Sequence, residues 1–354
     1  SWRGKARAVS LRQTARPMRY ASRLLQAMGF VLLMNGDSPQ EVLLREIKRP
    51  TITHVLCHYA HFAVRFMDVW RTVSTPLFVH FHGYDATFDL RPDDQPYKRY
   101  FSDDYLLAVR ELSTRAILIA NSEFTKSLLI DAGLPSDRIE VKYLGVHIPP
   151  EIKKHGRVNE VTILHVGRLV DFKSPDRTIM AFEMARSRGL KGRLIIAGDG
   201  PMRITCELLR MRSPYKDSIE ILGAVDHDRV QRLLIEADIY TQHNVKGEIS
   251  RQSECFGVSI IEAMAMGLPI VGTRSGAVQE TVVDGVTGFL IDPGDVEAQA
   301  NALLRLAADP DLRQHFGEAG HRRVKERFSI EIERQRLFTI MNLPSDSPSR
   351  GKHL

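Results

Sequence analysis

The hydrophobic positions of this sequence fall into short apolar runs that alternate with longer amphipathic stretches. Four runs have the length of strands in the first part of the chain, and six follow in the second part. They are Thr53–Cys57, Leu77–Phe81, Ala116–Ala120, Ile139–Tyr143, Val161–Val166, Arg193–Ala197, Ile219–Leu222, Ile239–Gln242, Pro269–Gly272 and Phe289–Ile291. Short apolar strands that alternate with helices are typical of βαβ units. The pattern predicts an α/β protein with parallel sheets.

Helices are expected between these runs. The amphipathic stretches include Asp176–Arg188, Asp228–Ala237 and Val258–Met266, and one last helix is expected over Arg322–Met341. A helix start is also predicted at Ser38, because proline follows at the first helical position and Glu41 completes a capping box.

The chain divides where both periodicities stop. Its 354 residues suffice for about two domains. Gly145–Glu151, followed by the polar stretch Lys153–Gly156, fits neither a strand nor a helix, so we place the linker there. We expect an N-terminal domain over residues 1–146 and a C-terminal domain with a terminal helix over residues 147–343. The tail, residues 344–354, is too polar to remain folded.

Composition limits the class of protein. With 43% hydrophobic and 26% charged residues, and no apolar run near the roughly 20 residues of a membrane-spanning helix, the chain has the composition of a soluble globular protein. Cys57, Cys206 and Cys255 lack ligand spacing, which argues against disulfides and against a zinc site. A cytoplasmic location is the expectation.

The net charge of +6 is concentrated at the start of the chain, where seven basic residues precede the first acid, Asp37. Basic and apolar residues mix over Ala15–Val31, so one interpretation is a helix in peripheral contact with the inner face of a membrane. The alternative, which we favour, is a solvated helix whose apolar side faces the core. No recognition motif accompanies the charge, which argues against a nucleic-acid partner.

The most informative segment runs from Glu254 to Pro269 across a loop-to-helix junction. Gly257 lets the backbone approach a ligand, and the helix that starts at Val258 points unsatisfied N–H groups at the junction, where an anion is the natural occupant. Glu254 and Glu262 can then reach one bound ligand and accept sugar hydroxyls. The alternative makes Glu262 a glutamate favoured by the helix dipole and Glu254 a solvated loop residue.

A second candidate segment follows the first strand of the C-terminal half. Arg168 and Lys173 come directly after Val161–Val166. Ligands of open parallel sheets lie at the carboxyl ends of strands, so these two cations can meet a diphosphate there. The alternative is a pair of exposed basic residues.

A third candidate lies in the N-terminal half, where the run Leu77–Phe81 ends at His82 and Gly83. His82 can bond a sugar hydroxyl or assist proton transfer from the opposite side of a cleft. A lone histidine is more often structural, and His58 and His61 are weaker candidates still.

Together these segments resemble the GT4-type retaining glycosyltransferases, the glycogen-synthase-like family that includes bacterial exopolysaccharide and lipopolysaccharide enzymes. The resemblance runs from about Thr53 to Phe328. The segments that carry it, in family order, are His82–Asp85, Ala120–Glu123, Gly167–Arg168 with Lys173, Ala197–Pro201, Glu254 with Glu262, Gly276–Glu280 and Asp284–Gly288.

The resemblance implies the GT-B fold, in which two Rossmann-like, doubly wound parallel-sheet domains face a cleft. It also implies a hexosyltransferase that uses a UDP- or GDP-sugar and acts on a saccharide or lipid-linked acceptor in bacterial surface polysaccharide biosynthesis. Arg168 and Lys173 would bind the diphosphate, Glu262 the ribose and Glu254 the hexose. The amides of Phe256, Gly257 and Val258 would cradle sugar and phosphate, Gly223 to Val225 would line the nucleobase, and His82 would meet the sugar.

The chemistry agrees with front-face transfer that retains the anomeric configuration. Charge on the leaving diphosphate is the main obstacle, and fixed positive groups relieve it without a divalent metal or other cofactor. Asp226-His227-Asp228 and Asp309-Pro310-Asp311 have the spacing of metal-dependent transferases, but each precedes a helical pattern and is better interpreted as an N-cap.

The sequence departs from the family before Thr53, where members usually carry an opening strand, a glycine-rich turn and further βα units. We therefore expect an incomplete N-terminal domain. Cys255 stands where glycine or serine is more usual, and Ala277 stands where a second glycine is common. Two alternatives stay open: a catalytically inactive fragment that binds a nucleotide sugar, and a GT-B-fold epimerase or phosphorylase.

Overall fold

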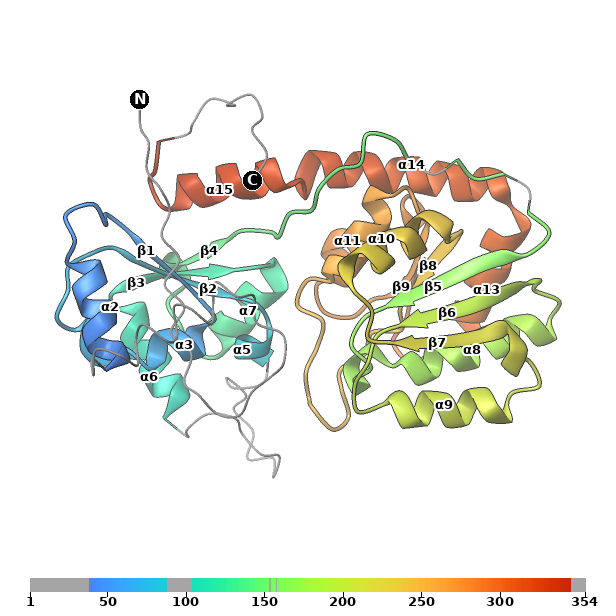
Figure 1. Cartoon of the computed structure of the whole chain (residues 1–354), viewed down its shortest axis with the longest axis horizontal. Helices are drawn as coiled ribbons and strands as arrows, with labels where there is room; N and C mark the ends of the chain where they lie inside the picture. The colour runs from blue at the N-terminus through green and yellow to red at the C-terminus, as the bar shows by residue number, and fades with distance from the viewer. Residues whose placement is uncertain (1–37, 88–103, 153, 157, 345–354) are drawn as a thin grey trace.

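Two parallel sheets lie side by side in the computed structural model of the chain, which describes residues 38–87, 104–152, 154–156 and 158–344 (Figure 1). The first sheet has strand order β1-β2-β3-β4, and the second has strand order β10-β9-β8-β5-β6-β7. The sequence therefore predicted the α/β class and the two-sheet division correctly.

The first sheet is built from β1 (Val55–His58), β2 (Leu77–Phe81), β3 (Ala116–Ala120) and β4 (Ile139–Val141). Its helices are α2 (Pro39–Ile47), α3 (Ala60–Val64), α4 (Met67–Trp70), α5 (Tyr84–Thr87), α6 (Tyr105–Ser113) and α7 (Glu123–Asp131), with a 3-10 turn at Ser136–Arg138. The capping box predicted at Ser38 is present, because the hydroxyl and Glu41 each accept the other's backbone N–H.

The two faces of the first sheet are covered by different parts of the chain. Val79 and Leu118 point into a core shared with the helices that follow them in sequence. Phe78 and Ile119 point to the opposite face, where they pack against Met341 near the end of the chain. Successive side chains of a strand point to opposite faces of the sheet, and here both sets are apolar. Both faces of the first sheet must therefore be covered.

The second sheet is built from β5 (Val161–Val166), β6 (Gly192–Ala197), β7 (Ile219–Gly223), β8 (Ile239–Thr241), β9 (Ile270–Thr273) and β10 (Gly288–Ile291). Its helices are α8 (Pro175–Ser187), α9 (Arg203–Arg212), α10 (His227–Glu236), α11 (Val258–Ala265), α12 (Val278–Thr281), α13 (Val296–Ala308) and α14 (Pro310–Arg327), with 3-10 turns at Asp171–Lys173 and Lys216–Ser218. Asp226 and Asp309 cap α10 and α14, as predicted.

Helices cover both faces of the second sheet. On one face, Leu164 and Tyr240 pack with residues of α10 and α11. On the other face, Ile163 and Leu194 pack with residues of α8 and α13. All ten predicted strands are present in the two sheets, each within two residues of its predicted bounds.

The end of the chain corrects one prediction. A single helix over Arg322–Met341 is wrong, because α14 ends at Arg327 and α15 (Ile330–Ile340) starts after Ser329, whose hydroxyl caps it. At this break the chain crosses back to the first sheet alongside Val146, which bonds to Phe328 and Ile330. Residues 330–343, which we had grouped with the C-terminal domain, therefore pack on the first sheet (Figure 1).

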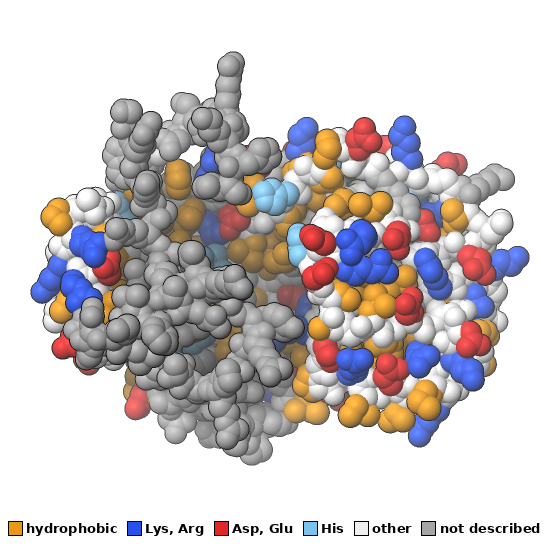
Figure 2. Space-filling view, in the orientation of Figure 1, with side chains coloured by type: hydrophobic (Ala, Val, Ile, Leu, Met, Phe, Trp, Pro, Cys, Tyr) orange, Lys and Arg blue, Asp and Glu red, His pale blue; other side chains and the backbone are white. Residues whose placement is uncertain are grey.

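On the second sheet and its helices, acidic and basic side chains are interspersed on the visible surface and do not form separate patches. Figure 2 shows this mixture, so this face carries no uniform basic patch. Within the part of the chain that the structure describes, no helix combines the length and the apolar character needed to cross a membrane.

Candidate functional site

The turns after β5 and β6 are joined at the carboxyl edge of the second sheet. The amides of Gly167 and Leu169 donate to Ala197 and Asp199, each over 3.0 Å. A side chain on Gly198 would put its Cβ 1.8 Å from the Gly167 carbonyl oxygen, so only glycine permits this approach. The backbone that carries Arg168 is thereby fixed.

Lys173 lies at the end of the 3-10 turn that follows β5. Its side chain is buried, and its Nζ lies 2.6 Å from Oε2 of Glu254. Both side chains are about nine-tenths removed from solvent, at 11% and 12% exposed. The alternatives of an exposed lysine and a solvated glutamate are therefore wrong for this pair.

The loop that brings Glu254 to Lys173 is fixed by Asp171. One oxygen of this carboxylate accepts the amides of Ile249 and Ser250, over 2.9 and 2.7 Å, and the other accepts the Ser250 hydroxyl. The turn after β9 supports the same loop, since the amide of Ala277 donates to the Glu254 carbonyl over 2.9 Å. Segments that are far apart in the sequence thus hold one ion pair.

Glu254 stands directly before the first turn of α11. Its Oε1 accepts the Phe256 amide over 3.4 Å, and Gly257, with φ of 84°, turns the chain into the helix. Burial by itself would raise the pKa of Glu254, but the Lys173 ammonium and the nearby amides outweigh it and hold the pKa below its usual value. The carboxylate is therefore charged near neutral pH.

Arg168 shares an aromatic platform with Lys173. The Arg168 guanidinium lies 5.7 Å from the centre of the Phe172 ring, and the Lys173 ammonium lies 6.0 Å from the same centre. Arg168 is exposed whereas Lys173 is buried. The two predicted cations are thus near one another, one reaching into solvent and one held inside.

Glu262 has different surroundings from Glu254. It lies on α11, half-buried, where burial raises its pKa and the charge of His227 opposes that rise. Val258, at the start of the helix, is 38% exposed.

At the end of β7, Gly223 has φ of 72° and its carbonyl accepts the Gly198 amide, while Val225 packs on the neighbouring core.

The turn that carries His82 touches the Glu254 loop across the two sheets. Gly83 has φ of 102°, and a Cβ there would lie 2.6 Å from Cβ of Cys255. Asp85 fixes this turn by accepting the amides of His82 and Ala60, and burial raises its pKa to about 6. The turn at His82 and Gly83, which was predicted to face a cleft, therefore contacts the loop before α11 of the second sheet.

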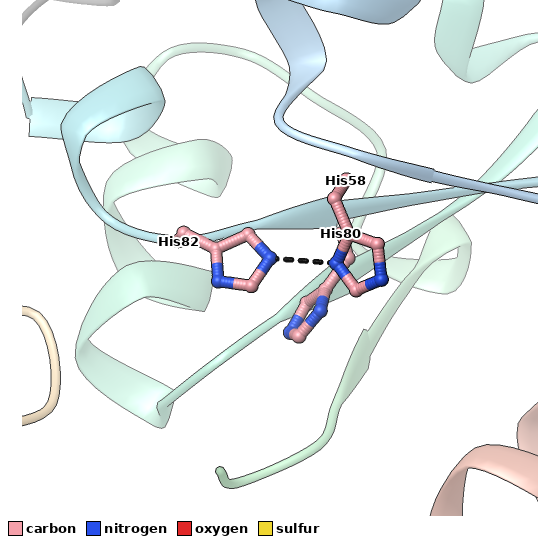
Figure 3. A group of neighbouring side chains, drawn as sticks. All are labelled: His58, His80 and His82. Atoms are coloured by element: carbon pink, nitrogen blue, oxygen red, sulfur yellow. Dashed lines mark hydrogen bonds between the residues drawn. The ribbon is translucent and has the colours of Figure 1, made fainter. Parts of the chain in front are cut away.

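Although the His82 turn touches the Glu254 loop, the imidazole of His82 lies against His58 rather than near Glu254. Its Nε2 lies 2.9 Å from Nδ1 of His58, and His80 lies beside both rings (Figure 3). Burial, with smaller contributions from His58 and Lys142, lowers the pKa of His82 to about 4. Sequence reasoning missed His80, although its alternation with His82 along one strand was a usable signal.

A second contact between the sheets was not predicted. The Glu280 carboxylate of α12 accepts the amides of Glu123 and Phe124 at the start of α7, over 2.9 and 2.8 Å. Nearby, Tyr143 stacks on Phe256 with ring centres 5.9 Å apart. Because helix N-termini attract carboxylates, Glu280 connects the two units electrostatically.

Two parallel sheets that meet across such contacts, with the start of α11 beside them, are the arrangement of the GT-B fold. A family model described as Glycosyl transferases group 1 matches residues 148–323, and one described as Glycosyltransferase Family 4 matches residues 23–148. The chain belongs to this GT4-type family.

Curated relatives and a solved structure agree with this assignment. The chain is 29% identical to N-acetyl-alpha-D-glucosaminyl L-malate synthase of Bacillus anthracis over 49% of this chain and 43% of that protein. It is 27% identical to the amylovoran biosynthesis glycosyltransferase AmsK of Erwinia amylovora over 74% of this chain and 62% of that protein. The chain thus spans less than two thirds of these relatives.

The fold is similar to that of Anabaena HepE, solved in complex with UDP and glucose. The two structures have a TM-score of 0.69 at 22% sequence identity, over 86% of this chain and 81% of HepE. This similarity supports the GT-B fold.

Proposed function

We propose that the chain transfers a hexose from a UDP- or GDP-sugar to a saccharide or lipid-linked acceptor, with retention of configuration, in bacterial surface polysaccharide biosynthesis. Relatives named for amylovoran and capsular polysaccharide biosynthesis support the pathway class. The HepE complexes with UDP and with UDP-glucose support the donor class. The proposed location is the cytoplasm, at or near the inner face of the membrane.

One observation carries the proposal: the buried Lys173–Glu254 ion pair lies at the start of α11. An ammonium has three N–H donors, so Lys173 can hold Glu254 and a phosphate oxygen together. Arg168, on the same aromatic platform, supplies a guanidinium fork for the other phosphate. The helix start adds its dipole where leaving-group charge develops.

We propose the remaining roles from the family resemblance, and the positions of Glu254 and Glu262 along α11 and its preceding loop support them. Glu254, fixed by its ion pair, would accept hexose hydroxyls, and Glu262 would accept those of the ribose. The amides of Phe256, Gly257 and Val258 would cradle sugar and phosphate. Gly223 and Val225, at the end of β7, would border the nucleobase. His82 would approach the sugar by turning from His58.

We also propose that transfer requires no divalent metal. Two cations and a helix start supply the positive charge that a metal would otherwise bring to the diphosphate. Adding a chelator to the reaction should not lower the rate, and a loss of turnover that Mg²⁺ or Mn²⁺ restores would contradict this part of the proposal.

Calorimetry with UDP and with GDP tests the cation assignment. A charge-assisted hydrogen bond contributes about 1.5–3 kcal/mol, so Arg168→Ala should weaken binding by about ten- to a hundredfold. Arg212→Ala is the matched control, because Arg212 is also exposed but ends α9. Equal affinities in the two variants would remove Arg168 from the site.

Turnover tests the reaction itself. A thermal-shift panel of nucleotide sugars first identifies the donor, since a ligand that binds only the native state raises its stability. Release of nucleotide diphosphate that depends on an added acceptor is then the expected result. Donor binding without such release would favour the nucleotide-sugar-binding alternative.

A further inference from the structure

Three imidazoles gather on one face of the first sheet. β1 and β2 are parallel neighbours in which His58 pairs with His80, so both side chains point to the same face. His82 is two positions beyond His80 and continues that row past the end of the strand. This is the face that α15 covers further along. The register of two strands thus assembles the cluster.

The ring nitrogens of the cluster are close enough to share one ion. One nitrogen from each of the three histidines lies within 4.8 Å of the other two, and those of His58 and His82 are 2.9 Å apart (Figure 3). Zn²⁺ binds imidazole nitrogen at about 2.0–2.1 Å, which places the nitrogens of a tetrahedral site about 3.3 Å apart. The observed separations, from 2.9 Å to at most 4.8 Å, include that value.

His80 supplies an independent indication of a ligand. Its side chain is 1% exposed, and neither ring nitrogen has a hydrogen-bond partner among the described residues. Buried polar atoms are nearly always paired, because leaving one unpaired costs about 1–3 kcal/mol. A metal ion between the three rings would satisfy the nitrogen of His80 that faces its neighbours.

The surrounding backbone already holds the histidines in place. Asp85 accepts the amide of His82 through one oxygen and that of Ala60, two residues after His58, through the other. The Tyr59 amide donates to the His80 carbonyl over 2.8 Å. His58 is exposed, which leaves an entry path from solvent. A fixed ligand set with one open side can bind a metal with little reorganisation.

The nearest positive charge is compensated. Lys142 is buried behind the cluster, but its ammonium is paired with the Glu333 carboxylate of α15. An approaching cation therefore meets a neutral pair rather than a free ammonium. Three nitrogen ligands without a carboxylate favour a transition metal over Mg²⁺ or Ca²⁺, which prefer oxygen.

We propose that His58, His80 and His82 form a Zn²⁺ site with a fourth position open to solvent. The ion would replace the proton shared by His58 and His82, and it would connect β1 to β2. None of its ligands belongs to the second sheet, where the diphosphate is proposed to bind. His82 is shared with the proposed sugar contact, so Zn²⁺ and the sugar would compete for this imidazole.

Isothermal titration of ZnCl₂ into the untagged, EDTA-treated full chain tests the site. One Zn²⁺ per chain is expected, and Co²⁺ should give the intense visible absorption of a tetrahedral site. His58→Gln should weaken binding by about a hundredfold or more, since loss of outer-shell partners alone reaches about that effect. His58 is exposed, so this variant should fold; His82→Gln is the second variant.

The matched control is His315→Gln, because His315 is exposed on α14, away from the first sheet's strand ends. It should bind Zn²⁺ like the unaltered chain, as should Lys173→Ala, which separates this proposal from the donor-binding one. Zn²⁺ affinity that is unchanged in both His58→Gln and His82→Gln, or the absence of stoichiometric binding to the unaltered chain, would overturn the inference.

Discussion

The two sheets differ in what covers them. The second sheet is enclosed by helices that alternate with its own strands, and its candidate site lies in turns after β5 and before α11. The first sheet has one face covered by its own helices, whereas the other contacts α15, which arrives from the end of the chain. The first unit therefore depends on a segment from the far end of the chain, whereas the second is covered by its own helices.

The largest effect should come from the ion pair that joins α15 to Lys142, the residue after β4. Glu333→Ala leaves the Lys142 ammonium buried without its partner, because the lysine side chain is only 2% exposed. Breaking such a pair costs about 3–5 kcal/mol. Urea unfolding of the full chain should show this loss.

The control for that variant is Glu140→Ala, which breaks the ion pair between β4 and Arg336 of α15. Arg336 and Glu140 are 42% and 46% exposed, so this loss should be about 0–1 kcal/mol. Equal losses in the two variants would show that burial does not distinguish the two pairs, and that α15 is not held as described.

An intermediate effect is expected where the sheets touch. Gly83→Ala would put a Cβ 2.6 Å from that of Cys255 and so displace the His82 turn from the Glu254 loop. Small displacements of catalytic groups cost up to about a hundredfold in rate. Transfer should therefore slow by about ten- to a hundredfold, while UDP affinity stays within about twofold.

Gly189→Ala is the control, because it introduces a similar backbone strain to Gly83→Ala without a steric clash. Its φ of 98° is close to the 102° of Gly83, but nothing lies within 4 Å of the added Cβ. It should lower stability without slowing transfer. If Gly83→Ala weakened UDP binding as much as turnover, the donor site would not be confined to the second sheet.

The smallest effect should come from Glu280→Gln. The amide retains one acceptor oxygen for the start of α7 and loses the charge that the helix end attracts, at a cost of about 0.3–1 kcal/mol. A few-fold fall in kcat/KM is the expected kinetic result. Glu318→Gln is the control, because its carboxylate accepts from Gln314 on the same helix. No difference between the two variants would remove Glu280 as a connection between the sheets.

Much of the fold could be predicted from local patterns. The runs that became β2, β3 and β5 were predicted with their observed bounds, because each is a short apolar segment buried in a parallel sheet. The break at Ser329 was missed, since the amphipathic pattern continues through it. It depends on Val146 crossing beside Phe328 and Ile330, a contact between distant segments.

The candidate site was predictable in part. Arg168, Lys173 and Glu254 could be named as candidates because glycine turns, strand ends and a helix start mark them locally. Their mutual arrangement was not, since the burial of Lys173 depends on the Asp171 carboxylate fixing the loop that ends at Glu254. His80 was missed because its importance arises from the register between β1 and β2.

The central claim is that Lys173 binds the diphosphate while Glu254 binds the hexose. The most direct test compares UDP affinity in Lys173→Ala and Glu254→Gln by calorimetry. Lys173→Ala should weaken UDP binding by about ten- to a hundredfold. Glu254→Gln should leave it unchanged or tighter, because the Lys173 ammonium is no longer neutralised, and should abolish most of the transfer. UDP affinity unaffected by Lys173→Ala would contradict the account.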